Sequence, residues 1–300
     1  MSFQRATRTQ ARARVAIDGP AKSGKSKTAL RLAFSLGKKV AAIDTEFGSL
    51  SKYADDSDEG EGPYTFDVCN LRTFSPDSYT AEIQAAERTG FDVLIIDSLS
   101  HAWVGEGGAL DIKDRQGGNS FVAWQKVTPI HRRMIDAILA SRLHVIATMR
   151  SKTEYVLEEE INRNGKTVQV PKKIGMAPVQ RDGTEYEFDM LLSMNQAHLC
   201  TVTGSRCPAM DGKSTVKPGA EFFRPYVEWL GLGRPESPRS TPEQINRYAA
   251  ALNGAAAEPY RRRIQELYRV ADFDQLTTTD AEDVLTKLEA AKVAANVPTS

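Results

Sequence analysis

A phosphate-binding loop is the strongest chemical signal in the sequence. Residues 19–26 read Gly-Pro-Ala-Lys-Ser-Gly-Lys-Ser and match the pattern G-x-x-x-x-G-K-[ST] in full. The glycines let backbone N–H groups surround phosphate oxygens, Lys25 reaches the outer phosphates, and Ser26 offers its hydroxyl to Mg²⁺. The nucleotide-binding residues that the motif predicts are Gly19, Pro20, Ala21, Lys22, Ser23, Gly24, Lys25, Ser26 and Lys27.

Two acidic residues that follow apolar strands complete a candidate site for hydrolysis. A buried run ends in Asp97, whose carboxylate can hold the Mg²⁺ that Ser26 also binds. If the strand before Glu46 lies next to the phosphate-loop strand, Glu46 lies beside the γ-phosphate and can orient water. The alternative for Glu46 is a solvated acidic loop, because acidic residues continue to Glu61. Lys25 and Glu46 are the candidate catalytic residues, and Ser26 and Asp97 are the candidate metal ligands.

Four segments position these residues. Residues 1–14 form an arm with four arginines and no acidic residue, and residues 15–230 alternate short apolar strands with helical stretches. That alternation predicts an α/β core with a mostly parallel central sheet, typical of a P-loop NTPase. Residues 231–240 are a linker rich in Gly, Pro and Ser, and residues 241–300 form a small helical module.

The expected elements follow from apolar periodicity and turn residues. In the core, strands are predicted at 14–18, 40–44, 65–71, 91–97, 144–149, 186–194 and 198–203, with a hairpin of 154–161 and 166–170 turned by Asn164-Gly165. Core helices are predicted at 25–36 and at 121–141, the second interrupted by Pro129. In the module, capping boxes at Thr241–Gln244 and Thr279–Glu282 begin two helices, and 260–270 forms a third.

Composition excludes several classes of protein. The 300 residues hold 39 basic and 39 acidic side chains, which argues against coating nucleic acid by bulk positive charge. The charge is segregated, however, with six acidic and no basic residues in 54–67 and five basic against one acidic in 162–183. The apolar runs are too short to span a membrane. Three cysteines without a C-x-x-C pair predict reduced thiols in a cytosolic protein rather than disulfides or a zinc site.

The order of G-P-A-K-S-G-K-S, I-D-T-E-F-G-S and L-I-I-D-S resembles the RecA-like P-loop ATPases, most of all the short phage-encoded ATPases of recombination and single-strand annealing. The resemblance spans residues 14–205 and implies a RecA-like core that binds ATP and Mg²⁺, with Glu46 as catalytic base. RecA-like proteins usually carry an Asn-Gln sensor pair where this chain has Thr148-Met149-Arg150, which makes Arg150 the candidate sensor. A phage-encoded protein of this kind would act in the bacterial cytoplasm.

The resemblance also implies partners. RecA-like cores bind single-stranded DNA through loops after strands 4 and 5, which would be residues 105–120 and 151–173 here; the alternative for the second is a solvated hairpin. Basic side chains on such loops can follow a phosphate backbone. The candidate DNA-binding or trans-acting residues are Arg150, Lys172, Lys173, Arg181, Lys113 and Arg115.

An F-x-x-A motif at Phe3 and Ala6 is a candidate for oligomerisation. In RadA-type proteins such a motif on an N-terminal arm inserts into the neighbouring subunit, which implies a homo-oligomer, either a filament or a ring. The alternative is a disordered arm.

Two functions are compatible with these patterns. The first is an ATP-hydrolysing recombination protein that binds single-stranded DNA and promotes annealing or strand exchange. The second is a nucleotide-dependent loader or adaptor of a replication or recombination complex. It would act through residues 241–300 on a single-strand-binding or other recombination protein. A small-molecule P-loop kinase fits less well, because the sequence has no recognisable acceptor-binding or lid motif.

Overall fold

The structure is a computed structural model. It describes residues 10–56, 62–117, 119–161, 167–232, 240–251, 257–268, 273, 276 and 278–295, and within these ranges the side chains of residues 153–175 and of some residues in the last three helices are not described. The chain divides into two units, Ala11–Leu232 and Gly233–Ser300 together with Met1–Gln10.

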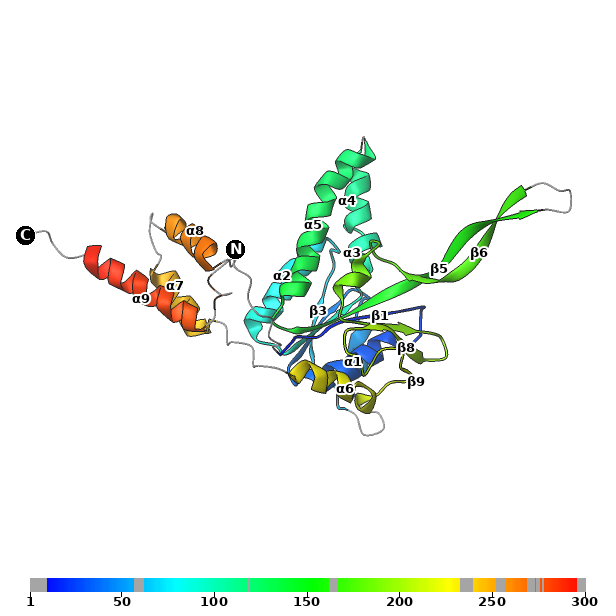
Figure 1. The fold of residues 1–300 in the computed structure, drawn as a ribbon, viewed down its shortest axis with the longest axis horizontal. Coiled ribbons are helices and arrows are strands. Elements are labelled where there is room, and N and C mark those ends of the chain that lie inside the picture. Colours follow the sequence, from blue (N-terminus) through cyan, green and yellow to red (C-terminus); the bar gives the residue numbers. More distant parts are fainter. Residues whose placement is uncertain are drawn as a thin grey trace, which may run out of the picture. The chain divides into compact units, whose positions relative to one another are not determined.

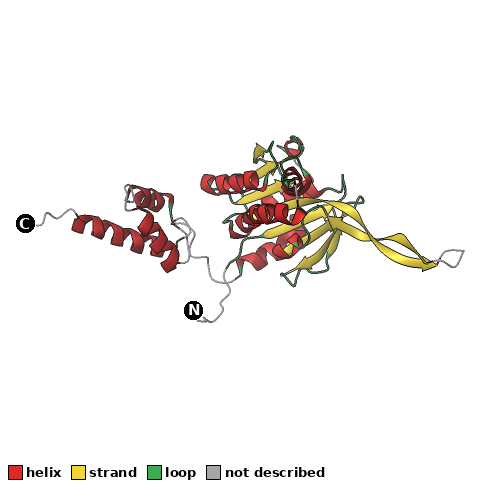
Figure 2. Cartoon of the chain, turned by 90° about the horizontal axis from the view of Figure 1, so that it is seen from above, coloured by secondary structure: helices red, strands yellow, loops and turns green. Residues whose placement is uncertain are grey.

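The first unit is built on a nine-stranded sheet (Figures 1 and 2). Its strands are β1 (Arg14–Gly19), β2 (Val40–Asp44), β3 (Asp67–Asn70), β4 (Val93–Asp97), β5 (His144–Ile161), β6 (Thr167–Pro178), β7 (Met190–Met194), β8 (Leu199–Ser205) and β9 (Ser214–Val216). The order is β3-β2-β4-β5-β1-β7-β8-β9, with β6 paired to β5. Pairing is parallel from β3 to β7 and antiparallel for β5–β6, β7–β8 and β8–β9. The predicted α/β class with a mostly parallel sheet is therefore confirmed.

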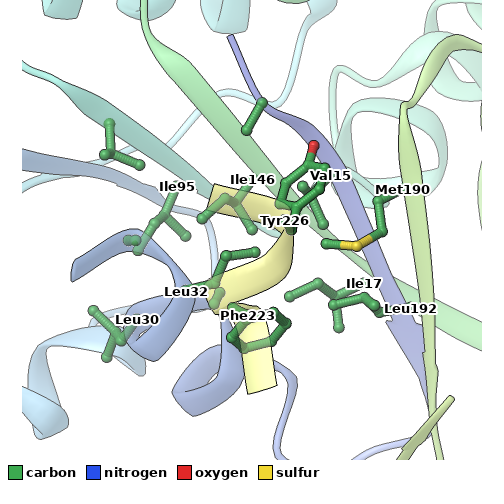
Figure 3. Close-up of a cluster of buried hydrophobic side chains, with 14 of the residues drawn as sticks. Val15, Ile17, Leu30, Leu32, Ile95, Ile146, Met190, Leu192, Phe223 and Tyr226 are labelled. Atoms are coloured by element: carbon green, nitrogen blue, oxygen red, sulfur yellow. The ribbon is translucent and has the colours of Figure 1, made fainter. Parts of the chain in front are cut away.

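Helices cover both faces of this sheet. They are α1 (Lys25–Leu36), α2 (Pro76–Thr89), α3 (His101–Val104), α4 (Ala109–Arg115), α5 (Ser120–Ala140) and α6 (Ala220–Gly231), with single 3₁₀ turns at Leu50–Tyr53 and Thr184–Glu187. On one face, α1 and α6 pack side chains such as Leu30 and Phe223 against Val15 and Ile17 of β1 (Figure 3). On the other face, α2 and α5 pack against the alternate strand residues, such as Ala16.

The start of β1 is held by a buried arginine. The guanidinium of Arg14 donates hydrogen bonds to the carbonyls of Ala13, Leu139, Ser141 and Leu143. Burial outweighs the neighbouring acidic charges and lowers the pKa of Arg14 to about 10. The side chain thus ties the strand that leads to the phosphate loop to the C-terminal end of α5.

The hairpin is longer than the sequence pattern predicts. β5 is one strand of 18 residues that starts inside the sheet and continues into a two-stranded ribbon with β6, from Ser151↔Pro178 to Ile161↔Thr167. The ribbon projects away from the sheet (Figures 1 and 2). The predicted turn residues, Asn164-Gly165, lie outside the described residues.

Three other sequence predictions are wrong in detail. Residues 105–120, expected as a loop, contain the helix α4 and lead directly into α5. Pro129 does not interrupt α5, which runs unbroken from Ser120 to Ala140; Pro129 and Gln125, whose carbonyl loses its helical N–H partner, are both exposed residues. The strand expected from residue 186 starts at Met190, after the 3₁₀ turn.

The second unit consists of α7 (Pro242–Ala251), α8 (Ala257–Tyr268) and α9 (Thr278–Ala295). Tyr248, Ile264, Phe273 and Leu285 are among the side chains of its separate apolar cluster. The predicted capping box is confirmed at α7, where the Thr241 N–H donates to Gln244 Oε1 and the Gln244 N–H donates to Thr241 Oγ1. None of the helices in the described part of the chain combines the length and apolarity that a bilayer crossing requires.

Candidate functional site

The phosphate loop connects the end of β1 to the start of α1, as the motif requires. Gly24 precedes the helix with φ of 96°, a left-handed conformation that glycine adopts without strain. A Cβ on Gly19 would lie 2.5 Å from the Met194 carbonyl oxygen and 2.7 Å from Ser23 Oγ. Both glycines are therefore required by the backbone of a loop whose N–H groups can surround phosphate oxygens.

Lys25 reaches back across this loop. Its Nζ donates to the carbonyl oxygens of Gly19 at 2.9 Å and Pro20 at 2.8 Å. Burial lowers the pKa of Lys25, and the charges of Asp97, Glu46 and Asp18 oppose that change. The ammonium group is thus held over the loop by neutral carbonyls, and phosphate oxygens would be stronger partners for it.

Asp97 ends β4 beneath the loop and is almost fully buried. Thr148 donates a hydrogen bond to its Oδ1, whereas Oδ2 is buried with no hydrogen-bond partner among the described residues. Burial raises the pKa of Asp97, and the nearby hydroxyl groups of Ser26 and Thr148 oppose the rise. A buried carboxylate oxygen without a partner, beside the Ser26 hydroxyl, fits a hard cation such as Mg²⁺, which binds few protein oxygens and keeps other positions for water and phosphate.

Glu46 lies at this edge of the sheet although its strand is not the neighbour of the phosphate-loop strand, the arrangement from which the sequence analysis predicted its position. β2 does not lie next to β1, because β4 and β5 are inserted between them. All four strands are parallel, however, with Asp44 level with Asp97 and Gly19 level with Arg150, so their carboxyl ends share one edge of the sheet. Glu46 therefore contributes to the electrostatics of Lys25 from two strands further away.

Arg150 holds Glu46 in this structure. Its Nε and Nη2 donate to Glu46 Oε1 at 3.1 and 2.9 Å, and both side chains are partly exposed. Arg150 also affects the pKa of Lys25, which it lowers. The candidate sensor, the candidate base and the phosphate-loop lysine thus form one electrostatic group.

The structure adds residues that the sequence pattern did not single out. The Ser151 hydroxyl donates to Asp18 Oδ2 at 2.6 Å, directly before the loop, and burial raises the pKa of Asp18. On the other side, the ring of His198 lies 3.0 Å from the Ser23 carbonyl oxygen through Nδ1. Asp18, Thr148 and Ser151 could have been found from the sequence, because each lies at or near the predicted end of a strand. Nothing in the sequence pointed to His198, because the turn that carries it approaches the loop only once β7 and β8 pair.

The remaining candidates are placed apart from this group or lie outside the described residues. Lys113 and Arg115 lie on α4 and pair with Asp114 and Asp111, at 2.8 Å in each case. The Arg181 backbone N–H donates to Gln180 Oε1 at 2.8 Å. Lys172 and Lys173 pair through their backbones with Val156 and Tyr155, but their side chains are not described. Phe3 and Ala6 lie outside the described residues.

Comparison with known proteins identifies a family. The model of the AAA_24 family, described as an AAA domain, matches residues 11–216. No curated protein is similar enough to the chain to count as a relative. Among solved structures, a Pyrococcus horikoshii OT3 protein has 11% identity and a TM-score of 0.35, covering 69% of this chain and 94% of its own. A prototypical ATPase of the type III secretion system of pathogenic bacteria has 13% identity and a TM-score of 0.34, covering 92% and 80%. These two scores are too low to support an inference.

Proposed function

The chain belongs to the AAA domain family, and from that premise we propose that it is an ATP-hydrolysing DNA recombination protein that binds single-stranded DNA. The observation that carries the ATPase part is the convergence of Lys25, Ser26, Asp97 and Glu46 at one edge of the sheet, with a carboxylate oxygen of Asp97 buried and without a partner among the described residues. A buried carboxylate oxygen without a partner, beside a complete phosphate loop, is where a Mg²⁺ ion bound with the nucleotide would find its protein ligand.

The roles of the residues follow from their positions. The loop N–H groups and Lys25 bind the phosphates of ATP and stabilise the charge that develops on them. Ser26 and Asp97 would hold Mg²⁺, which supplies charge neutralisation at the phosphates when bound. Glu46 orients a water molecule for attack on the γ-phosphate and accepts its proton. Arg150 positions Glu46 and, as a cation next to Lys25, offers a contact to the γ-phosphate.

DNA binding is supported by the projecting β5–β6 ribbon and by the sequence of its surroundings. Residues 162–183 contain five basic and one acidic residue, and a two-stranded ribbon is an element that can follow a nucleic acid. The β5 strand of the ribbon carries the acidic run 158–160, so the contact is assigned to the β6 side. β5 carries Thr148, Arg150 and Ser151, which contact Asp97, Glu46 and Asp18, and then continues into the ribbon. A homo-oligomer, as a filament or ring, belongs to the same proposal through the resemblance to RecA-like ATPases.

A second candidate function is a nucleotide-dependent loader or adaptor that acts mainly through protein contacts. The observation in its favour is that residues 240–295 contain an apolar cluster of their own, as a separate interaction module would. This function predicts slow hydrolysis that DNA does not change.

The deciding experiment is ATP turnover of the full chain with and without single-stranded and double-stranded DNA, with DNA retention measured in parallel. We expect turnover that single-stranded DNA stimulates, and we expect Glu46→Gln to bind ATP while turnover falls about 10²–10⁴-fold. Glu228→Gln, which removes an exposed carboxylate on α6, is the matched control. ATP turnover that DNA does not change, together with no retention of DNA, would contradict the proposed role in recombination. Unchanged turnover of Glu46→Gln would remove Glu46 from its role.

A further inference from the structure

The helix α8, labelled in Figure 1, carries three neighbouring arginines. Arg261, Arg262 and Arg263 are all exposed, whereas the next residue, Ile264, is buried in the unit's apolar cluster. Successive residues of an α-helix are about 100° apart around its axis, so three in a row cover an arc of about 200°. The face of α8 opposite its buried residue is therefore cationic at this level, with one acidic residue, Glu258 or Glu266, a turn away on either side.

These arginines differ from the other basic side chains described in the same unit. Arg247 pairs with Glu282 at 3.0 Å, and Lys287 pairs with Asp283 at 2.6 Å. Among the side chains that the structure describes, none forms an ion pair with Arg261, Arg262 or Arg263; the side chains of Glu258 and Glu266, one helical turn away on either side, are not described. Successive residues of a helix do not face each other, so the three exposed guanidinium groups point in different directions and can each meet an external anion.

The surroundings of the arginines distinguish between classes of anionic partner. A protein partner usually buries aromatic or aliphatic side chains at the centre of the interface. Among the described side chains of residues 240–295, none is a large hydrophobic group that is exposed. A phosphodiester backbone needs no apolar contact, and the guanidinium group matches phosphate oxygens in a bidentate manner. Among the side chains that the structure describes, therefore, the surface around the arginines offers charge without exposed apolar area, which favours nucleic acid over an acidic protein.

We propose that α8 is a second nucleic-acid contact, which binds the phosphate backbone without regard to sequence through Arg261, Arg262 and Arg263. The inference rests on the DNA binding proposed above and adds a site in the second unit, separate from the β5–β6 ribbon. It also gives the second unit a nucleic-acid role in place of a protein-binding one.

The test measures the salt dependence of DNA binding by the full chain. Fluorescence anisotropy with labelled single strands of two different sequences, and with a duplex, gives the slope of log K against log salt concentration. We expect R261Q/R262Q/R263Q to lower that slope on single strands by about 2, because each lost phosphate contact contributes about 0.7. The loss should be equal for both sequences, and larger on the duplex, where each contact contributes about 0.9.

Two matched variants separate charge from structure. R261K/R262K/R263K keeps the charge and should keep most of the slope, whereas R247Q, which removes a paired arginine of the same unit, should leave the slope unchanged. Circular dichroism at 222 nm should be the same for all variants. An unchanged slope for the glutamine variant overturns the proposal, as does an equal loss in the lysine variant. Polyglutamate that competes with DNA for these arginines at equal charge would assign the surface to acidic protein and also overturn it.

The proposal and the proposed function fail in different ways. If the wild-type chain binds DNA but the glutamine variant keeps the full slope, only the α8 contact is wrong. If the wild-type chain hydrolyses ATP but binds no DNA, the recombination function and the α8 contact are both wrong, while the ATPase assignment stands. ATP turnover without DNA should be unchanged in the glutamine variant, because Lys25, Ser26, Glu46 and Asp97 all belong to the first unit.

Discussion

At the scale of one residue, the buried carboxylate of Asp97 lowers the stability of the folded, nucleotide-free protein. Its carboxylate is buried, one oxygen has no partner among the described residues, and its pKa is raised mainly by burial. A raised carboxylate pKa means that the ionised form is less favourable in the folded chain than in the unfolded chain. At neutral pH, therefore, the charge of Asp97 destabilises the nucleotide-free protein.

We predict that Asp97→Asn raises the melting temperature of the nucleotide-free protein at pH 7 while abolishing Mg²⁺-dependent ATP turnover. A gain of about 1 kcal/mol corresponds to about 2–4 °C for a domain of this size. The gain is full above the raised pKa and disappears well below the ordinary Asp pKa of about 3.9, where the carboxyl group is neutral in both states. Calorimetry at about pH 7 and about pH 3 measures the full gain and its loss. A lower melting temperature at pH 7 would show that ionised Asp97 is stabilised by partners after all.

The Glu46–Arg150 pair supports a second prediction at the same scale. Because both side chains are partly exposed, the pair contributes about 0–1 kcal/mol to stability. Arg133–Asp77 is a comparable exposed pair at 3.0 Å, far from the loop in sequence. We expect Arg150→Gln and Arg133→Gln to change the denaturation midpoint equally little, and only Arg150→Gln to lower ATP turnover. Equal turnover in both variants would show that Arg150 has no part in the reaction.

At the scale of elements, the start of α7 offers a direct measurement. Thr241 and Gln244 form reciprocal hydrogen bonds that satisfy two N–H groups of the first turn. We expect Thr241→Ala to cost about 1 kcal/mol and to speed hydrogen exchange in the first turn of α7 about fivefold. Thr286→Ala is the control, because Thr286 lies inside α9 and bonds only to the Glu282 carbonyl oxygen, so alanine there should be neutral or stabilising. Equal exchange in both variants would mean that the cap contributes nothing.

β5 is the element in which prediction and structure differ most. The sequence predicted a strand at 144–149 and a separate hairpin of 154–161 and 166–170, whereas the structure joins the first two segments into one strand and extends the third to Pro178. The joining residues, such as Ser151 and Lys152, are polar or charged, and β6 supplies their hydrogen-bond partners. Hydrophobic periodicity detects burial, so it marked the two ends of β5 but not the polar junction between them.

At the scale of the whole molecule, the two units have separate apolar clusters. Leu285 is fully buried in the second unit, and Leu32 is fully buried in the first. We predict that Leu285→Ala, which should cost about 2–5 kcal/mol, unfolds the second unit and weakens DNA binding while DNA-free ATP turnover persists. Leu32→Ala should reduce turnover by destabilising α1. Loss of turnover in Leu285→Ala would show that the ATPase site depends on the second unit.

The sequence by itself determined the phosphate loop, the Asp at the end of the buried β4, the α/β class and the first cap of the helical module. These features depend on residues that are close together in the chain or on local periodicity. Only the tertiary structure decided that two strands lie between the strand of Glu46 and the phosphate-loop strand, that Arg150 binds Glu46, and that Asp97 keeps one oxygen without a partner among the described residues. Strand order and burial arise from packing between distant segments, and one sequence contains no direct record of that packing.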